Sequence, residues 1–145
     1  MEQQQDLQFA SELRSALNKL IKKLRKESPT GQKFSQTERS VMSSLHQNEV
    51  MLPSELAANE MITNQSMSQV LNNLFDRGYI IRIPSETDKR KVNISLSDEG
   101  EAIFLQFRHE RDEWLLKAIN STCTAEEKEL LKQVIIPVMK LAEFK

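Results

Sequence analysis

One stretch of the chain combines an apolar stripe with a face made only of amides and hydroxyls. Its apolar residues recur three or four positions apart, at Met67, Val70, Leu71 and Leu74, which is the spacing of one buried helical face. The remaining face carries Asn64, Gln65, Ser66, Ser68, Gln69, Asn72 and Asn73. Side chains of these types can pair with base edges in the major groove of DNA. The pattern therefore predicts a helix that buries one side and reads DNA with the other.

A charged hairpin is expected directly after this helix. Beyond Gly78 the apolar residues alternate, so that YIIRI and VNISL read as two strands joined by the loop PSETDKRK. The basic residues of this segment are Arg82, Lys89, Arg90 and Lys91, against the acids Glu86 and Asp88. A helix followed by a basic hairpin is suited to holding DNA, because the phosphate backbone attracts the basic loop.

Start and stop signals place the other elements. Ser35 and Glu38 form a capping box, Pro53 opens a short helix, Thr63 caps the helix described above, and Gly78 ends it. The first helix is expected from near Asp6 to Lys26, and a short stub of strand at residues 49–52. A long helix follows the cap at Ser97, from Asp98 to about Asn120. A last helix opens at Thr124 and contains Pro137, which should kink it.

This order predicts a mainly α fold with a small β-hairpin: a winged helix-turn-helix flanked by N- and C-terminal dimerisation helices. We divide the chain into an N-terminal helix (1–30), a DNA-binding domain (31–97) and C-terminal helices (98–145). Nothing in the middle domain covers the amphipathic flanking helices completely. Packing against a second copy would bury them, so we expect a two-fold homodimer.

Composition is compatible with this interpretation. The net charge of the 145 residues is −1, but the charge is uneven: residues 13–26 contain only basic charges, while the C-terminal third holds much of the acid. DNA responds to the local patch within about 8 Å at physiological salt. No apolar run could span a bilayer, and the N-terminus lacks the pattern of a secretion signal. One cysteine, Cys123, fits a reducing cytoplasm, so we expect a cytoplasmic protein without a membrane partner.

Other chemistry finds little support in the residues. No nucleophile–base pair or phosphate loop stands out, so we predict no enzymatic activity and no cofactor. His46 and His109 lie far apart without a ligand cluster, which argues against a metal site. Cys123 is interpreted as an incidental or structural thiol. Trp114 is interpreted as interface core, with a place in an effector pocket as the alternative.

The segment LFDRGYIIRIPSETDKRKVNISLSDEG resembles the multiple-antibiotic-resistance regulator (MarR) family of bacterial transcription factors. The matching positions are Leu74, Arg77–Gly78, Asp88 with Arg90, Leu96–Ser97 and Gly100, and the helix order on both sides agrees as well. The resemblance implies a homodimeric regulator, in our interpretation a repressor, on an inverted-repeat operator. It also implies that Arg90 enters the minor groove, oriented by Asp88, and that a small aromatic or phenolic effector releases the DNA. The effector-binding residues stay unknown at this point.

The chain departs from the family pattern in its reading helix. Members often carry Arg or Lys where Gln69 stands, and no basic residue occurs from Met61 to Asp76. Because amides pair best with adenine, we expect an A·T-rich operator core read by Gln65, Gln69 and Asn64, with the serines on phosphates. Further DNA contacts are expected on α-helix starts at Pro53, Ser54 and Thr63, and in the hairpin at Arg82, Asp88, Lys89, Arg90 and Lys91. The alternative is a winged-helix module that binds protein and has no specific DNA site.

Overall fold

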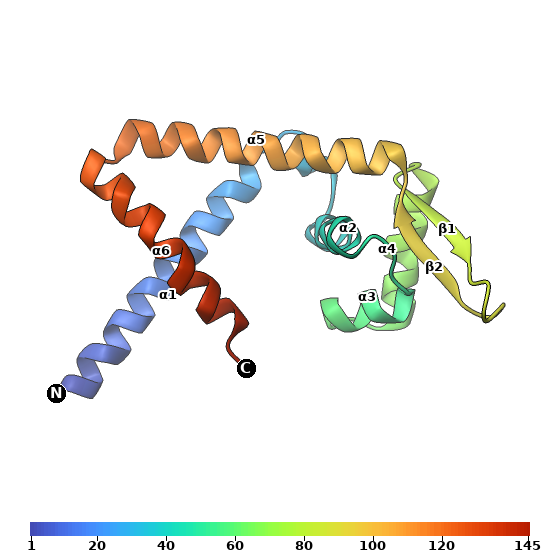
Figure 1. Cartoon of the computed structure of the whole chain (residues 1–145), viewed down its shortest axis with the longest axis horizontal. Helices are drawn as coiled ribbons and strands as arrows, with labels where there is room; N and C mark the ends of the chain where they lie inside the picture. The colour runs from blue at the N-terminus through green and yellow to red at the C-terminus, as the bar shows by residue number, and fades with distance from the viewer.

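The computed structural model describes residues 1–145 as a winged helix with two helical arms (Figure 1). The elements are α1 (Glu2–Lys26), the 3-10 helix η1 (Gly31–Lys33), α2 (Gln36–Asn48), α3 (Pro53–Glu60), α4 (Asn64–Asp76), β1 (Ile80–Pro84), β2 (Val92–Leu96), α5 (Asp98–Thr122) and α6 (Ala125–Glu143). The predicted fold class, mainly α with one antiparallel hairpin, is confirmed.

The helix starts predicted from capping residues are correct. The hydroxyls of Ser35, Thr63, Ser97 and Thr124 each accept a hydrogen bond from the backbone N–H three residues later. One predicted boundary is wrong. Helix α1 begins at Glu2 rather than near Asp6, because the leading Gln residues are good helix formers that lack the apolar period used to place the start. Helix α5 runs two residues past Asn120, to Thr122.

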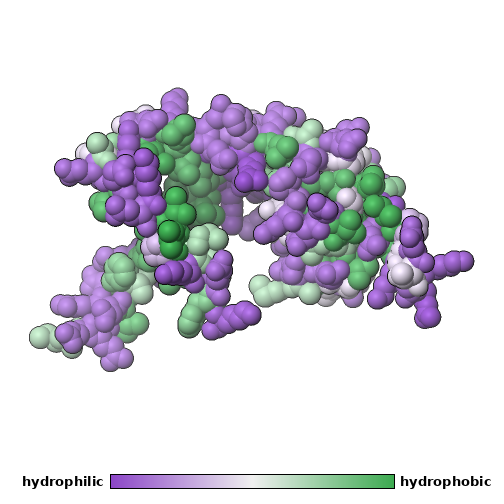
Figure 2. All heavy atoms as spheres, in the orientation of Figure 1, coloured by the Kyte–Doolittle hydropathy of each residue, from purple (hydrophilic) through white to green (hydrophobic).

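The buried core lies entirely in the middle of the chain. Its fourteen apolar residues are Phe34, Val41, Met42, Leu45, Met51, Leu56, Ala57, Met67, Leu71, Leu74, Ile80, Ile94, Phe104 and Phe107. Helices α1 and α6 contain no buried residue. In the space-filling view, apolar side chains therefore remain visible on the α5–α6 arm (Figure 2).

The hairpin is joined to the helices by one further bridge. Strands β1 and β2 pair antiparallel, with Arg82 opposite Ile94. Met51 forms an isolated antiparallel bridge with Ile94, where the sequence predicts a stub of strand. Because Met51 lies between α2 and α3, this bridge fixes the wing relative to both helices.

The Arg-Gly pair after α4 closes the winged helix. Arg77 donates to the buried Glu38 carboxylate at 3.2 Å and to the Lys33 carbonyl at 3.0 Å. Gly78 has a φ of +82°, a left-handed conformation that other residues rarely adopt. The Arg77 side chain thereby ties the end of α4 to the capping box that starts α2.

Gly100 allows α5 to begin directly against the strand side of the fold. A Cβ at this position would lie 1.9 Å from the Tyr79 carbonyl oxygen, so no larger residue fits without backbone movement. From there α5 contributes Phe104 and Phe107 to the core and then leaves the winged helix as an arm (Figure 1).

The arm ends in α6, which runs back and crosses α1 in this view (Figure 1). Pro137 lies inside α6, and the helix continues on both sides of it. None of the helices combines the length and apolar character that spanning a bilayer requires.

Candidate nucleic-acid interface

Helix α4 presents its polar face because its apolar stripe is buried. Met67, Leu71 and Leu74 are at most 3% exposed, which turns the opposite side outwards. All seven amide and hydroxyl residues predicted to read DNA are exposed: Asn64, Gln65, Ser66, Ser68, Gln69, Asn72 and Asn73. The structure thus brings the predicted set together on one accessible helical face.

The seven side chains differ in whether they already have partners. Ser66 accepts from the Thr63 hydroxyl at 3.0 Å, and Ser68 donates to the Asn64 carbonyl at 3.0 Å. Asn72 accepts a hydrogen bond from the Arg82 guanidinium. The side-chain amide groups of four residues make no hydrogen bond within the chain: Asn64, Gln65, Gln69 and Asn73. These four can therefore offer both a donor and an acceptor to a ligand.

Arg82 lies at the base of the wing, away from its tip. Its guanidinium stacks 4.3 Å from the centroid of the Phe75 ring and bonds to Asn72, both on α4. The sequence analysis predicts Arg82 as a DNA contact of the hairpin. In the structure its side chain links β1 to α4, a contact that the alternating pattern of the strand could not reveal.

The tip of the wing holds Arg90 extended into solvent. Its side chain is 96% exposed, and its backbone N–H donates to the Asp88 carboxylate at 3.0 Å. The guanidinium Nε lies 3.9 Å from the same carboxylate oxygen. Asp88 therefore shapes the turn that presents Arg90 more strongly than it holds the guanidinium itself. Lys89 and Lys91 are exposed on either side.

A groove of about 400 Å³ joins the wing to two helix starts. It is lined by Leu52, Pro53, Ser54, Asn64, Ser68, Arg90, Lys91 and Val92. The first turns of α3 and α4 carry the positive ends of their helix dipoles, which favour an anion. Arg90 and Lys91 add two positive charges, so the groove is suited to a phosphate of a nucleic-acid backbone. Leu52 and Val92 are lining residues that the sequence pattern did not indicate.

Comparisons with known proteins agree with this architecture. The model of the MarR family matches residues 34–92. An HTH-type transcriptional regulator of Mycobacterium bovis is 29% identical over 138 residues, which cover 95% of each chain. The crystal structure of a proposed transcriptional regulator from Pseudomonas aeruginosa has a TM-score of 0.85 and 30% identity, covering 97% of this chain and 99% of that one.

The winged helix also resembles a mutant of the Escherichia coli MarR protein that was solved with operator DNA. The TM-score is 0.61 at 22% identity, over 88% of this chain and 93% of that one, a likeness of fold alone. Taken with the other comparisons, the chain belongs to the MarR family of transcriptional regulators. The predicted family is confirmed, and so is the prediction of a regulator rather than an enzyme.

Proposed function

We propose that this chain acts as a homodimeric repressor that binds an inverted-repeat DNA operator. The observation that carries the proposal is the exposed polar face of α4, where four side-chain amides have no partner within the chain, together with the exposed wing residue Arg90. In this arrangement α4 enters the major groove and the wing reaches the flanking minor groove. The groove at Pro53, Ser54 and Lys91 then takes the intervening phosphate.

The terminal helices support the homodimer. Large apolar side chains remain exposed on α1, among them Leu7, Phe9 and Ile21, and on α6, among them Leu130, Ile135 and Ile136. Because an exposed apolar patch of this kind marks an interaction site, a second copy of the same helices is the partner that the proposal assigns to it. Two-fold symmetry then presents two α4 helices to two half-sites.

Repression in this proposal is steric, since a dimer on a promoter blocks polymerase. Both α4 helices engage only when they are spaced about one helical turn of DNA apart, roughly 34–36 Å. A small-molecule effector releases the operator when it binds more tightly to a dimer whose α4 helices have another spacing. The extent of release depends on the difference between its affinities for the DNA-binding spacing and the other spacing.

The wing gives the sharpest test of DNA binding. Arg90→Ala should weaken operator binding about tenfold or more, because a narrow A·T minor groove favours an inserted arginine. Lys89→Ala is the matched control, since it removes one exposed charge from the same loop, and it should cost less affinity. Both variants should reduce the slope of log affinity against log salt concentration by about 1. Fluorescence anisotropy with labelled operator at two salt concentrations measures both. Equal, negligible effects would favour the alternative, a winged-helix module that binds protein.

The reading helix tests base preference separately. Gln69→Ala should relax the preference at one A·T base pair by about 1–3 kcal/mol if the amide contact is bidentate. Asn120→Ala removes an exposed amide from α5 and should leave base preference unchanged. Selection of binding sites from a random DNA pool reports both variants. A selected site with a G·C core would refute the predicted A·T-rich operator.

A further inference from the structure

Among the amide side chains on the exposed face of α4, that of Asn72 differs in having a partner within the chain. Its Oδ1 atom accepts a hydrogen bond from the Arg82 guanidinium. Arg82 belongs to β1, which lies beside α4 (Figure 1). The bond therefore joins the wing to one residue of the face that is proposed to read DNA.

Two contacts hold the Arg82 side chain against α4. Its guanidinium donates to Asn72 and stacks 4.3 Å from the centroid of the Phe75 ring. Asn72 and Phe75 are three positions apart, so they are neighbours on the helix surface. A planar guanidinium can bond to one of them through its edge while its face covers the other. Arg82 forms no ion pair that would draw it away from this place.

The partner decides which way the Asn72 amide faces. A guanidinium carries N–H donors and no acceptor, so the carbonyl oxygen of Asn72 has to face Arg82. The NH2 group of the amide is then left for a ligand. Because a hydrogen bond from a cation is stronger than one between neutral groups, it also resists rotation of the amide. Asn72 therefore presents only a donor, whereas a free amide presents a donor and an acceptor.

Asn72 lies in line with the residues that are proposed to read bases. Gln65, Gln69 and Asn72 follow one another at spacings of four and three positions, which places them along one stripe of the helix. All three are exposed. A cavity of about 170 Å³ between α4 and the wing is lined by Asn72 together with Pro53 and Ser68, which also line the groove suited to a phosphate. A duplex held at that groove would therefore lie within reach of Asn72.

We infer that Arg82 sets the base preference of Asn72, so that Asn72 reads guanine and not adenine. Adenine presents a donor at N6 and an acceptor at N7, which pair with the acceptor and the donor of a free amide. Guanine presents two acceptors, O6 and N7, and these match an amide that can only donate. The guanine lies at the end of the A·T-rich core assigned to Gln65 and Gln69. The inference deepens the proposed function and rests on it, and Arg82 is a positioning residue because it acts through Asn72.

Base preference in two variants tests the inference. Site selection from a random DNA pool with the wild type and with Asn72→Ala identifies the base pair that Asn72 contacts, because the preference at that pair is lost in the variant. At this pair, fluorescence anisotropy should show the wild type binding guanine about fivefold or more tightly than adenine. Arg82→Met frees the amide and should reverse the order. A wild type that prefers adenine there, an Arg82→Met protein that still prefers guanine, or an Asn72→Ala protein with unaltered preferences would overturn the inference.

A direct contact of Arg82 with DNA predicts different results. If Arg82 bound a base itself, Arg82→Met would alter the preference in an Asn72→Ala background as well. If it bound a phosphate, Arg82→Met would reduce the slope of log affinity against log salt concentration by about 1. Either change would overturn the inference. Lys91→Met is the matched control, since it removes a wing cation that makes no side-chain hydrogen bond to Asn72, and it should leave the preference at that base pair unchanged.

The bond between Arg82 and Asn72 can be tested without DNA. Urea denaturation of the wild type, Asn72→Ala, Arg82→Met and the double variant gives a double-mutant cycle, in which the bond should couple the unfolding equilibrium constants about threefold or more. Additive effects would overturn the inference whatever the DNA results. Coupling without any specific DNA binding would refute the proposed function, and with it the reading role of Asn72. Coupling with operator binding but without the reversal of base preference would refute the inference alone.

Discussion

The winged helix and the terminal helices bury their apolar residues in different ways. All fourteen core residues lie between Phe34 and Phe107, whereas α1 and α6 contribute none. Both regions nevertheless carry amphipathic sequence. The difference indicates that the middle of the chain is stabilised by its own contacts, while the apolar residues of α1 and α6 are left without cover in the single chain. In the proposed dimer, the spacing of the two α4 helices could change without unfolding either winged helix.

Breaking the assembly should produce the largest effect. Replacing Leu131 and Ile135 on α6, which are 42% and 60% exposed, by Glu should raise the dimer dissociation constant about a hundredfold or more, because each charge would be buried in an apolar interface. Glu129→Gln on the same helix is the control and should sediment as the wild type. Analytical ultracentrifugation measures the dissociation constant, and NMR should show the winged helix still folded. A double variant that remains a dimer would contradict the assignment of this surface.

Within the winged helix, the two structural glycines should differ in sensitivity. Gly100→Ala should destabilise the fold by about 3 kcal/mol or more, since the new Cβ meets the Tyr79 carbonyl. Gly78→Ala enters open space but keeps a left-handed φ, so its cost should be about 1–2 kcal/mol. Urea denaturation of both variants gives the free energies of unfolding. The reverse order would mean that backbone strain outweighs steric overlap here.

The smallest effect concerns the junction between the two regions. Glu110 on α5 accepts hydrogen bonds from the Thr30 hydroxyl, the Thr30 N–H and the Ser28 hydroxyl after α1. Burial alone would raise the pKa of Glu110, but these bonds and the nearby Lys33 lower it overall. The ionised carboxylate therefore stabilises the fold at pH values above 4.5, the ordinary pKa of a glutamate side chain. This stabilisation is lost as the pH falls through the lowered pKa of Glu110.

Glu110→Gln should remove this contribution. Thermal melts across pH 3 to 7 should show the variant less stable than the wild type near neutrality, with the difference shrinking as the wild-type carboxylate becomes protonated at the acid end of that range. Glu113→Gln, at an exposed position on the same helix, is the matched control. A difference that grows towards low pH would refute the role given to the hydrogen-bonded carboxylate.

The features that sequence could predict are local ones. The caps at Ser35, Thr63, Ser97 and Thr124 need only the next three residues, and the stripe at Met67 and Leu71 needs only helical spacing. For the same reason the amide face of α4 and the basic wing could be located in advance. Their chemistry lies within one stretch of about forty residues.

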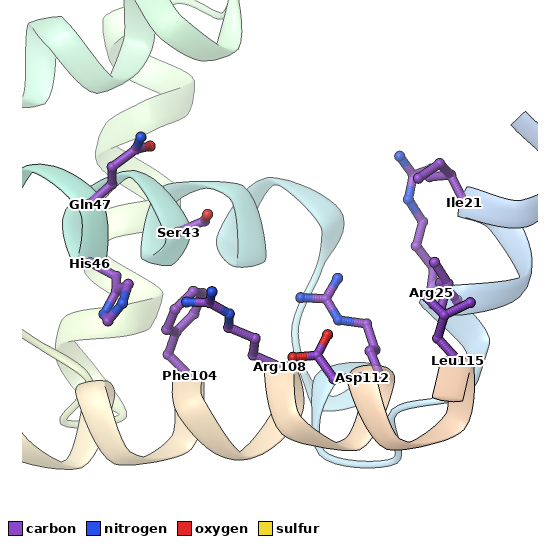
Figure 3. Close-up of a pocket in the computed structure, with 11 residues that line it drawn as sticks. Ile21, Arg25, Ser43, His46, Gln47, Phe104, Arg108, Asp112 and Leu115 are labelled. Atoms are coloured by element: carbon purple, nitrogen blue, oxygen red, sulfur yellow. The ribbon is translucent and has the colours of Figure 1, made fainter. Parts of the chain in front are cut away.

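Contacts between distant elements could not be predicted in this way. Arg82 bonds to Asn72 and stacks on Phe75 across the turn from helix to strand. Two adjoining cavities are lined by Arg25, Arg39 and Arg108, which come from α1, α2 and α5, and no spacing along the chain predicts that these residues lie close together. Figure 3 shows Arg25 and Arg108 at one of these cavities, on α1 and α5. The start of α1 was misplaced because helix-forming residues precede its apolar period.

We propose that two copies of this winged helix bind one DNA site, and a single titration decides whether they do. Labelled tiles of DNA from around the gene should be titrated with the full chain, followed by fluorescence anisotropy at two salt concentrations, with the stoichiometry measured on the tightest tile. We predict tight, salt-dependent binding of two chains to one tile that contains an inverted repeat, with the other tiles far weaker. Weak binding of equal strength to every tile would contradict the claim and favour the protein-binding alternative.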